Sequence, residues 1–130
     1  MITDPLDPLA RFLLHRNDIS PEHLRARPRA FLPDSRGETS VFRIGGLNDD
    51  EVWETGRVEV SQKRGLPLYG RADVTTASVA GAGLDVQSAE PPERHAVIVG
   101  WPPAKEERIS LAQQLAAEAQ LVLCSAVEPT

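Results

Sequence analysis

Residues 47–53 combine a dense set of helix-start signals. Asn48 is placed to cap a first turn, and Glu51, three residues later, is spaced to return a hydrogen bond in a capping box. Apolar residues flank the cap at the spacing of a hydrophobic staple, and three consecutive acids meet the positive end of the helix dipole. Gly65 supplies a stop after two basic residues. The pattern predicts a helix from Asp49 to about Lys63, which fixes one element of the fold.

Three other regions have the composition of β-strands. Ser40–Ile44 is β-branched and aromatic, and two glycines close it. Leu68–Val79 alternates in polarity, which predicts a long strand, and residues 81–83 permit a tight turn into a returning strand at 84–87. Residues 95–101 form an apolar run closed by two prolines. The sequence therefore predicts one strand before the helix, a hairpin in the middle of the chain and one further buried strand.

The remaining apolar periodicity is helical. The spacing predicts a helix from Pro5 to about Arg16, and Ser20–Glu22 carries a serine cap and a proline typical of a second, brief helix. Residues 25–37 contain two prolines and a glycine and are expected to be an exposed connection. The final helix is expected from about Lys105 to Leu123, with small residues that would let it lie close to a sheet. Its apolar stripe consists of Ile109, Ala112, Ala116, Ala119 and Leu123.

The predicted order of elements favours an α+β fold. We expect a small, mostly antiparallel sheet of about four strands, with helices packed on one face and a long C-terminal helix. A mixed sheet is left open, because the strand-helix-strand passage from Val41 to Val74 would allow one parallel crossover. The length of 130 residues predicts one domain, 1–130. Within it, 1–36 is expected to be an Arg-rich helical segment, and 37–130 to hold the sheet and the other helices.

Composition narrows the classes of partner and location. The formal net charge of −5 disfavours nucleic acid as a partner for the whole surface. The single cysteine, Cys124, allows no intramolecular disulfide, which favours a reducing cytoplasm. No apolar run approaches the roughly 20 residues that span a bilayer, so no membrane partner is expected. Arginine outnumbers lysine twelve to two, which is typical of a GC-rich bacterial genome.

One group of polar residues could carry chemistry. His95 stands at the start of an apolar strand, where it could act as a general acid or base. Arg43 lies in another predicted strand, and Arg71 lies between Tyr69 and Asp73 on one face of the long strand. If His95, Arg43 and Arg71 converge, they could bind an anion and move a proton, as phosphate chemistry requires. The competing interpretation is a surface histidine and an ordinary ion pair between Arg71 and Asp73.

A second group could bind a partner. Arg25, Arg27 and Arg29 form a compact basic run that could dock on an acidic partner, although such a run is also typical of a solvated loop. Trp101, between a glycine and two prolines, could cover a pocket or anchor an interface. No pattern predicts a cofactor: the three histidines lack metal-ligand spacing, and phosphate-binding glycine motifs are missing from the sequence. We therefore expect no cofactor and no metal ion.

Two functions are compatible with these sequence features. The first is a small cytoplasmic interaction, inhibitor or accessory-subunit domain without catalytic activity, which binds a protein partner encoded by a neighbouring gene. The alternative is a small phosphate- or nucleotide-handling enzyme, nuclease-like or ADP-ribosyl-handling, built on the Arg/His cluster. Self-association into a homo-oligomer is left open by the sequence.

Overall fold

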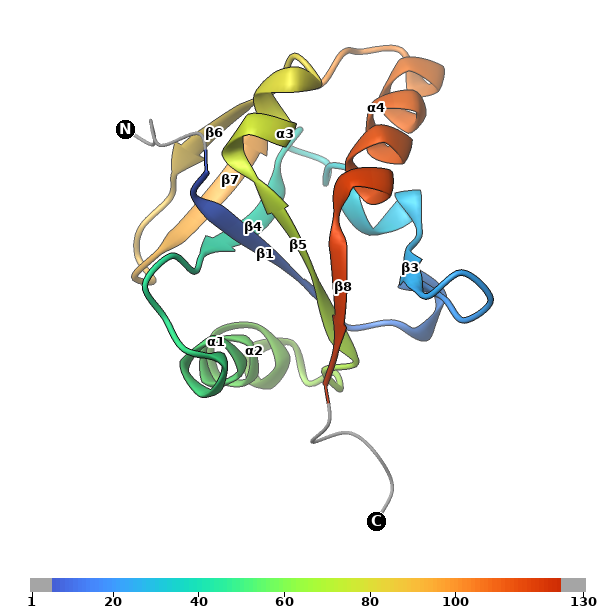
Figure 1. Cartoon of the computed structure of the whole chain (residues 1–130). Helices are drawn as coiled ribbons and strands as arrows, with labels where there is room; N and C mark the ends of the chain where they lie inside the picture. Colours follow the sequence, from blue (N-terminus) through green and yellow to red (C-terminus); the bar gives the residue numbers. More distant parts are fainter. Residues whose placement is uncertain (1–5, 125–130) are drawn as a thin grey trace.

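The computed structural model describes residues 6–124. Six strands form one sheet in the order β6-β7-β4-β1-β5-β8, and β2 and β3 form a separate ladder (Figure 1). The strands are β1 (Pro8–Leu13), β2 (Ile19–Ser20), β3 (Arg25–Ala26), β4 (Thr39–Arg43), β5 (Gly70–Thr75), β6 (Asp85–Ser88), β7 (His95–Val99) and β8 (Gln120–Leu123). The helical segments are η1 (Arg16–Asp18), η2 (Pro28–Phe31), α1 (Asp49–Gly56), η3 (Arg57–Ser61), α2 (Gln62–Arg64), α3 (Thr76–Gly81) and α4 (Lys105–Glu118).

The α+β class and the antiparallel sheet are confirmed, with six strands in place of about four. Every hydrogen-bonded pair in the described sheet is antiparallel, so the mixed sheet does not occur there. The crossover that the sequence left open, from β4 through α1 to β5, does exist. However, β1 lies between the two strands and pairs with both.

Strand β1 therefore occupies the interior of the sheet, and the helix predicted from Pro5 to Arg16 is wrong. Leu9 and Leu13 are buried on one face of the sheet, while Ala10 and Phe12 are buried on the other. A strand covered on both faces is a nearly continuous apolar run, and such a run imitates a helical stripe. The N-terminal helical segment 1–36 is corrected accordingly, because its described part contributes a central strand.

The second predicted helix, at Ser20–Glu22, is also wrong. The Ser20 Oγ accepts a hydrogen bond from the His23 N–H, as a capping serine does, but the chain then returns as β3. Residues 25–37 are only partly exposed. Their η2 segment buries Ala30 and Phe31 in the core beside α4.

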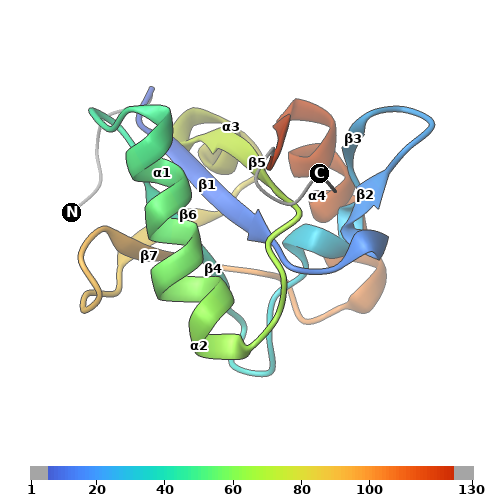
Figure 2. The same ribbon diagram turned by 90° about the horizontal axis from the view of Figure 1, so that it is seen from below.

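Helices cover both faces of the sheet rather than the one face expected. On one face, α3, α4 and η2 pack over a core that includes Val41, Ile98 and Leu115. On the other face, Val52 of α1 packs with Phe12 and Phe42. Figure 2 shows α1 and α2 running as one continuous coil across the strands. The candidate functional site lies on this second face.

The helix predicted from Asp49 to about Lys63 is confirmed in position, with η3 as a π-helical insert. Both hydrogen bonds of the Asn48–Glu51 capping box are present, each 2.9 Å long. The helix approaches β1 closely at Gly56. A Cβ there would lie 2.6 Å from the Phe12 ring, so only glycine fits without displacement.

The long strand predicted from Leu68 to Val79 ends early. Thr75 caps α3 by accepting a hydrogen bond from the Ser78 N–H, so residues 76–81 are helical. The strand expected at 84–87 exists as β6, but it pairs with β7 and not with β5, which overturns the predicted hairpin. The β-branched residues Thr75, Thr76 and Val79 favour a strand, and this conceals the helix cap in the sequence.

The C-terminal helix is shorter than predicted. Ala112, Leu115 and Ala116 are buried as expected, but α4 ends at Glu118 and β8 follows. Strand β8 pairs with β5, where Gly70 allows the Val122 carbonyl to approach. Cys124 is buried after this strand rather than near a helix end. Within residues 6–124, no helix has the length and apolar content needed to cross a bilayer.

Candidate functional site

The adjacent strands β4 and β7 bring Ser40 and His95 together. The Ser40 Oγ lies 2.7 Å from the His95 Nε2, and the His95 Nδ1 lies 3.0 Å from the Ala89 carbonyl oxygen. Because a carbonyl only accepts, Nδ1 carries the proton in the neutral imidazole, and Nε2 accepts from the Ser40 hydroxyl. The Phe42 ring lies beside the imidazole, with 5.1 Å between the ring centroids.

Ser40 and His95 line a pocket of about 320 Å³ between the sheet and the C-terminal end of the α1–α2 coil. Phe12 and Phe42 contribute apolar wall, and α2 contributes Lys63 and Arg64. The remaining lining residues are Arg11, Leu14, His15, Asp18, Glu59, Val60 and Pro92. The pocket therefore joins a hydroxyl-imidazole pair with three strongly basic side chains.

Arg11 is the most deeply placed of these cations. Its Nε donates to the Ala30 carbonyl at 2.7 Å, and its Nη1 donates to the Ser40 carbonyl at 2.9 Å. Burial lowers the pKa of the Arg11 guanidinium, Asp18 opposes this shift, and Arg64 adds to it. The hydrogen bonds fix the position of Arg11, but their neutral carbonyl acceptors do not neutralise its charge.

The carboxylates of the pocket already have cationic partners. Glu59 pairs with Lys63 at 2.6 Å, and Asp18 pairs with Arg29 at 3.1 Å. Arg64 forms no ion pair with any residue of the described chain. Two guanidinium charges, those of Arg11 and Arg64, thus have no carboxylate in contact among residues 6–124. An anion entering the pocket would meet a net positive field.

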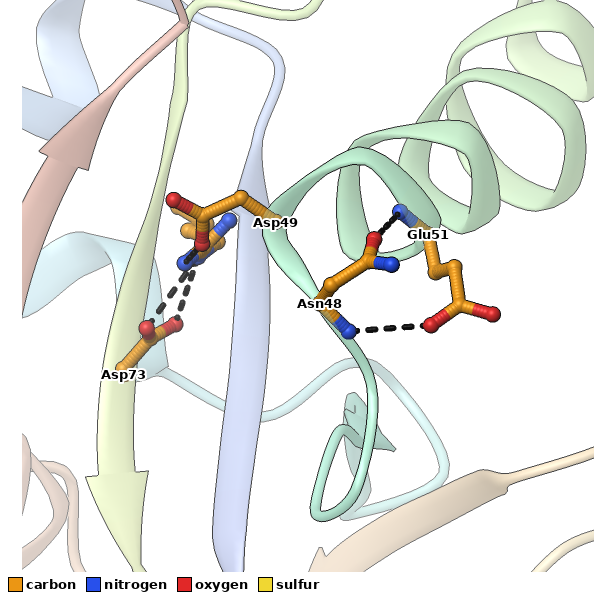
Figure 3. Close-up of polar contacts among 5 residues, drawn as sticks. Asn48, Asp49, Glu51 and Asp73 are labelled. Carbon is orange, nitrogen blue, oxygen red and sulfur yellow. Dashed lines mark hydrogen bonds and ion pairs between the residues drawn. The ribbon is translucent and has the colours of Figure 1, made fainter.

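A separate polar cluster surrounds Arg71 on the same face of the sheet. The Arg71 Nε donates to both carboxylate oxygens of Asp73, at 3.2 and 3.1 Å, and Nη2 contacts Asp49 at 3.2 Å. The Trp53 ring centroid lies 4.7 Å from the Arg71 Cζ. Figure 3 shows Asp73 beside Asp49 at the start of α1, next to the capping box. These contacts join the first turn of α1 to β5.

Burial dominates the electrostatics of this cluster. The Arg71 side chain is 6% exposed, and its Nη1 has no hydrogen-bond partner among the described residues. Burial raises the pKa of the Asp73 carboxyl, although Arg71 acts in the opposite direction. The predicted pairing of Arg71 with Asp73 is present. Tyr69, the third residue predicted for this face, instead contacts Arg16, whose Cζ lies 5.8 Å from the ring centroid.

The three predicted catalytic residues do not meet in one place. Only His95 lines the pocket. Arg71 stands on β5, three strands away from β7, and its contacts are Asp73, Asp49 and Trp53. Arg43 pairs with Glu90 at 3.8 Å, and its buried Nε has no partner among residues 6–124.

Sequence reasoning missed Ser40, Arg11 and Arg64. Arg11 carried a signal, because it is the one charge inside the apolar run of β1. Ser40 lies two positions before Phe42 and shares its face. Its proximity to His95 depends on the pairing of β4 with β7, which are far apart in the sequence.

The predicted partner-binding residues have contacts within the chain. The half-buried Trp101 donates its Nε1–H to the Ile98 carbonyl at 3.2 Å and packs against the core. Arg27 donates to the Ile19 carbonyl, and Arg29 pairs with Asp18. Arg25 is exposed on β3. A partner-binding role for these four residues stays a prediction.

Comparisons with known proteins do not assign the site: the sequence matches no protein-family model, and no curated protein or solved structure matches the chain. In the part of the chain from residue 6 to residue 124, no three His, Cys, Asp or Glu side chains are grouped to hold a metal ion. The geometry and charge of the pocket are therefore the basis for inferring a function.

Proposed function

We propose that the protein binds a small phosphate-bearing molecule in the pocket between β4, β7 and α2. The observation that carries this proposal is the pair of guanidinium groups, Arg11 and Arg64, with no carboxylate in contact among the described residues. Arg11 is held in place before any ligand arrives, so little side-chain freedom is lost there on binding. This proposal keeps the phosphate chemistry of the alternative function considered from the sequence but moves it to different arginines.

The size and donor set of the pocket support a phosphate group. A volume of about 320 Å³ suits a small metabolite rather than a macromolecular surface. Guanidinium and ammonium groups donate to phosphate oxygens from several directions, and the Ser40 hydroxyl adds a neutral donor. The aromatic walls, Phe12 and Phe42, offer an apolar surface to the organic part of the ligand.

Replacing Arg64 tests this proposal. We expect Arg64→Gln to weaken the binding of inorganic phosphate about tenfold, because one charge-assisted contact is removed. Chemical-shift titration of the His95 imidazole would measure the dissociation constant. Added sodium chloride should weaken binding to the unaltered protein, since the site is open to solvent.

Arg57→Gln is the matched control, because Arg57 stands in the same helical coil but pairs with Glu54 away from the pocket. This variant should bind phosphate like the unaltered protein. The proposal fails if millimolar phosphate leaves the His95 resonances unmoved, or if both arginine variants bind equally well.

Binding of a protein partner is a second proposal, and exposed apolar side chains favour it. Leu24, in the turn between β2 and β3, is 68% exposed, and Leu123 on β8 is 52% exposed. Strands β3 and β8 lie close together, and Leu24 directly precedes β3. A contiguous exposed apolar patch is typical of an interaction surface, and this proposal takes the two leucines as parts of such a patch.

Charged substitutions would separate this proposal from the first. We expect Leu24→Asp combined with Leu123→Asp to abolish stoichiometric co-purification with the product of a neighbouring gene, while phosphate binding stays unchanged. A complex that survives both substitutions would remove this surface from consideration.

A further inference from the structure

Ser40 and His95 have the arrangement of a nucleophile and its base. The 2.7 Å contact is short enough for direct proton transfer from Oγ to Nε2. The Ala89 carbonyl accepts from Nδ1 and so fixes the tautomer in which Nε2 is the acceptor. A nucleophile, a base and a group that orients the base are thus present together, at the wall of a pocket.

We propose that Ser40 is the nucleophile, and His95 the general base, in the hydrolysis of a phosphate monoester bound in this pocket. The inference rests on the proposed phosphate-binding function and adds a reaction to it. Both residues touch the pocket: Ser40 lies within β4, and His95 is the first residue of β7 and pairs with Phe42 in the ladder.

The reaction is balanced with water as the only co-reactant. The Ser40 Oγ forms a bond to phosphorus as its proton passes to the His95 Nε2. The bond from phosphorus to the ester oxygen breaks, and the leaving alcohol takes the proton from His95, which leaves a phosphoserine. Water then attacks phosphorus, gives a proton to His95, and releases inorganic phosphate as the Ser40 oxygen recovers that proton.

The basic side chains suit phosphoryl transfer better than acyl transfer. Negative charge in the phosphoryl transition state is spread over three equatorial oxygens, which guanidinium groups stabilise well. Arg11 lies next to the nucleophile, because its Nη1 is bonded to the Ser40 carbonyl. Lys63 and Arg64 face the same space from α2. All three cations therefore line the pocket that also contains the Ser40 hydroxyl.

The test combines turnover with detection of the intermediate. We use p-nitrophenyl phosphate as the substrate probe and expect Ser40→Ala to lower kcat at least about 100-fold. His95→Gln should lower kcat to a similar extent. Mass spectrometry after acid quenching should find phosphate on the peptide that contains Ser40, and Ser40→Ala should remove it.

Ser78→Ala is the matched control, because Ser78 is hydrogen-bonded to Thr75 on the other side of the molecule from the pocket. Thermal unfolding of each variant establishes that it folds. The proposed function is measured separately, as the binding of inorganic phosphate by the unaltered protein and its weakening in Arg64→Gln.

Each outcome decides the binding proposal, the catalytic inference or both. Phosphate binding without turnover or Ser40 labelling overturns the catalytic inference and leaves the binding proposal standing. Turnover that survives Ser40→Ala but not His95→Gln rejects Ser40 as nucleophile. Failure of the unaltered protein to bind inorganic phosphate overturns both claims.

Discussion

At the scale of single residues, Arg71 shows how a buried charge is accommodated beside an open pocket. Its guanidinium has carboxylates on two sides and a Trp53 ring within cation–π distance. The partly buried Asp73 is less well accommodated, because burial outweighs the attraction of Arg71 and raises its pKa. The cluster therefore holds α1 against β5 at an electrostatic cost that depends on pH.

That cost predicts the direction of a pH effect. Since the folded-state pKa of Asp73 is raised, its contribution to stability is fully present below the unfolded-state pKa of about 3.8 and is lost as pH rises through the folded-state value. We expect the free energy of unfolding to fall over that interval relative to Asp73→Asn. Urea unfolding of both proteins between acidic and neutral pH measures the difference.

Glu22→Gln controls for the loss of one carboxylate, because Glu22 is exposed in the turn between β2 and β3. Its stability difference from the unaltered protein should change little over the same interval. A difference between the unaltered protein and Asp73→Asn that grows in favour of Asp73 as pH rises would mean that the ion pair with Arg71 dominates.

At the scale of elements, the position of the α1–α2 coil depends on the small size of Gly56. The Phe12 ring occupies the space that a side chain at this position would need, and Leu68 also lies close. Phe12 and α2 both line the pocket, so the spacing between coil and sheet also sets the pocket width. Packing at Gly56 thus connects stability with the proposed binding site.

Gly56→Ala should therefore destabilise the protein. The added methyl meets ring carbons of Phe12 at 2.6 Å, and overpacking of this kind costs about 1–3 kcal/mol, against a gain of up to about 1 kcal/mol in helix propensity. We expect a net loss of roughly 1–2 kcal/mol in the free energy of unfolding, measured with urea.

Gly81→Ala is the comparison, because a Cβ at the end of α3 would meet nothing within 4 Å. This variant should be neutral or slightly more stable. Equal effects of the two substitutions would show that the helix moves freely away from Phe12.

At the scale of the whole molecule, features set by neighbouring residues could be predicted from the sequence. Features set by the pairing of distant strands could not. The α1 start was predictable because its capping box involves residues three apart. Strand β1 was mistaken for a helix because both of its faces are buried, a property that depends on β4 and β5. His95 was identified from its residue type, whereas Ser40 became a candidate only through the register of β4 on β7.

The early position of β1 in the sequence has a consequence for biosynthesis. As the nascent polypeptide leaves the ribosome, β1 emerges before its partners on either side, which arrive only with Arg43 and Thr75. Until then an apolar segment with two unsatisfied edges is exposed to the cell, and such a segment is a ready template for aggregation. Co-translational chaperone binding to this strand would shield it until the ladder closes.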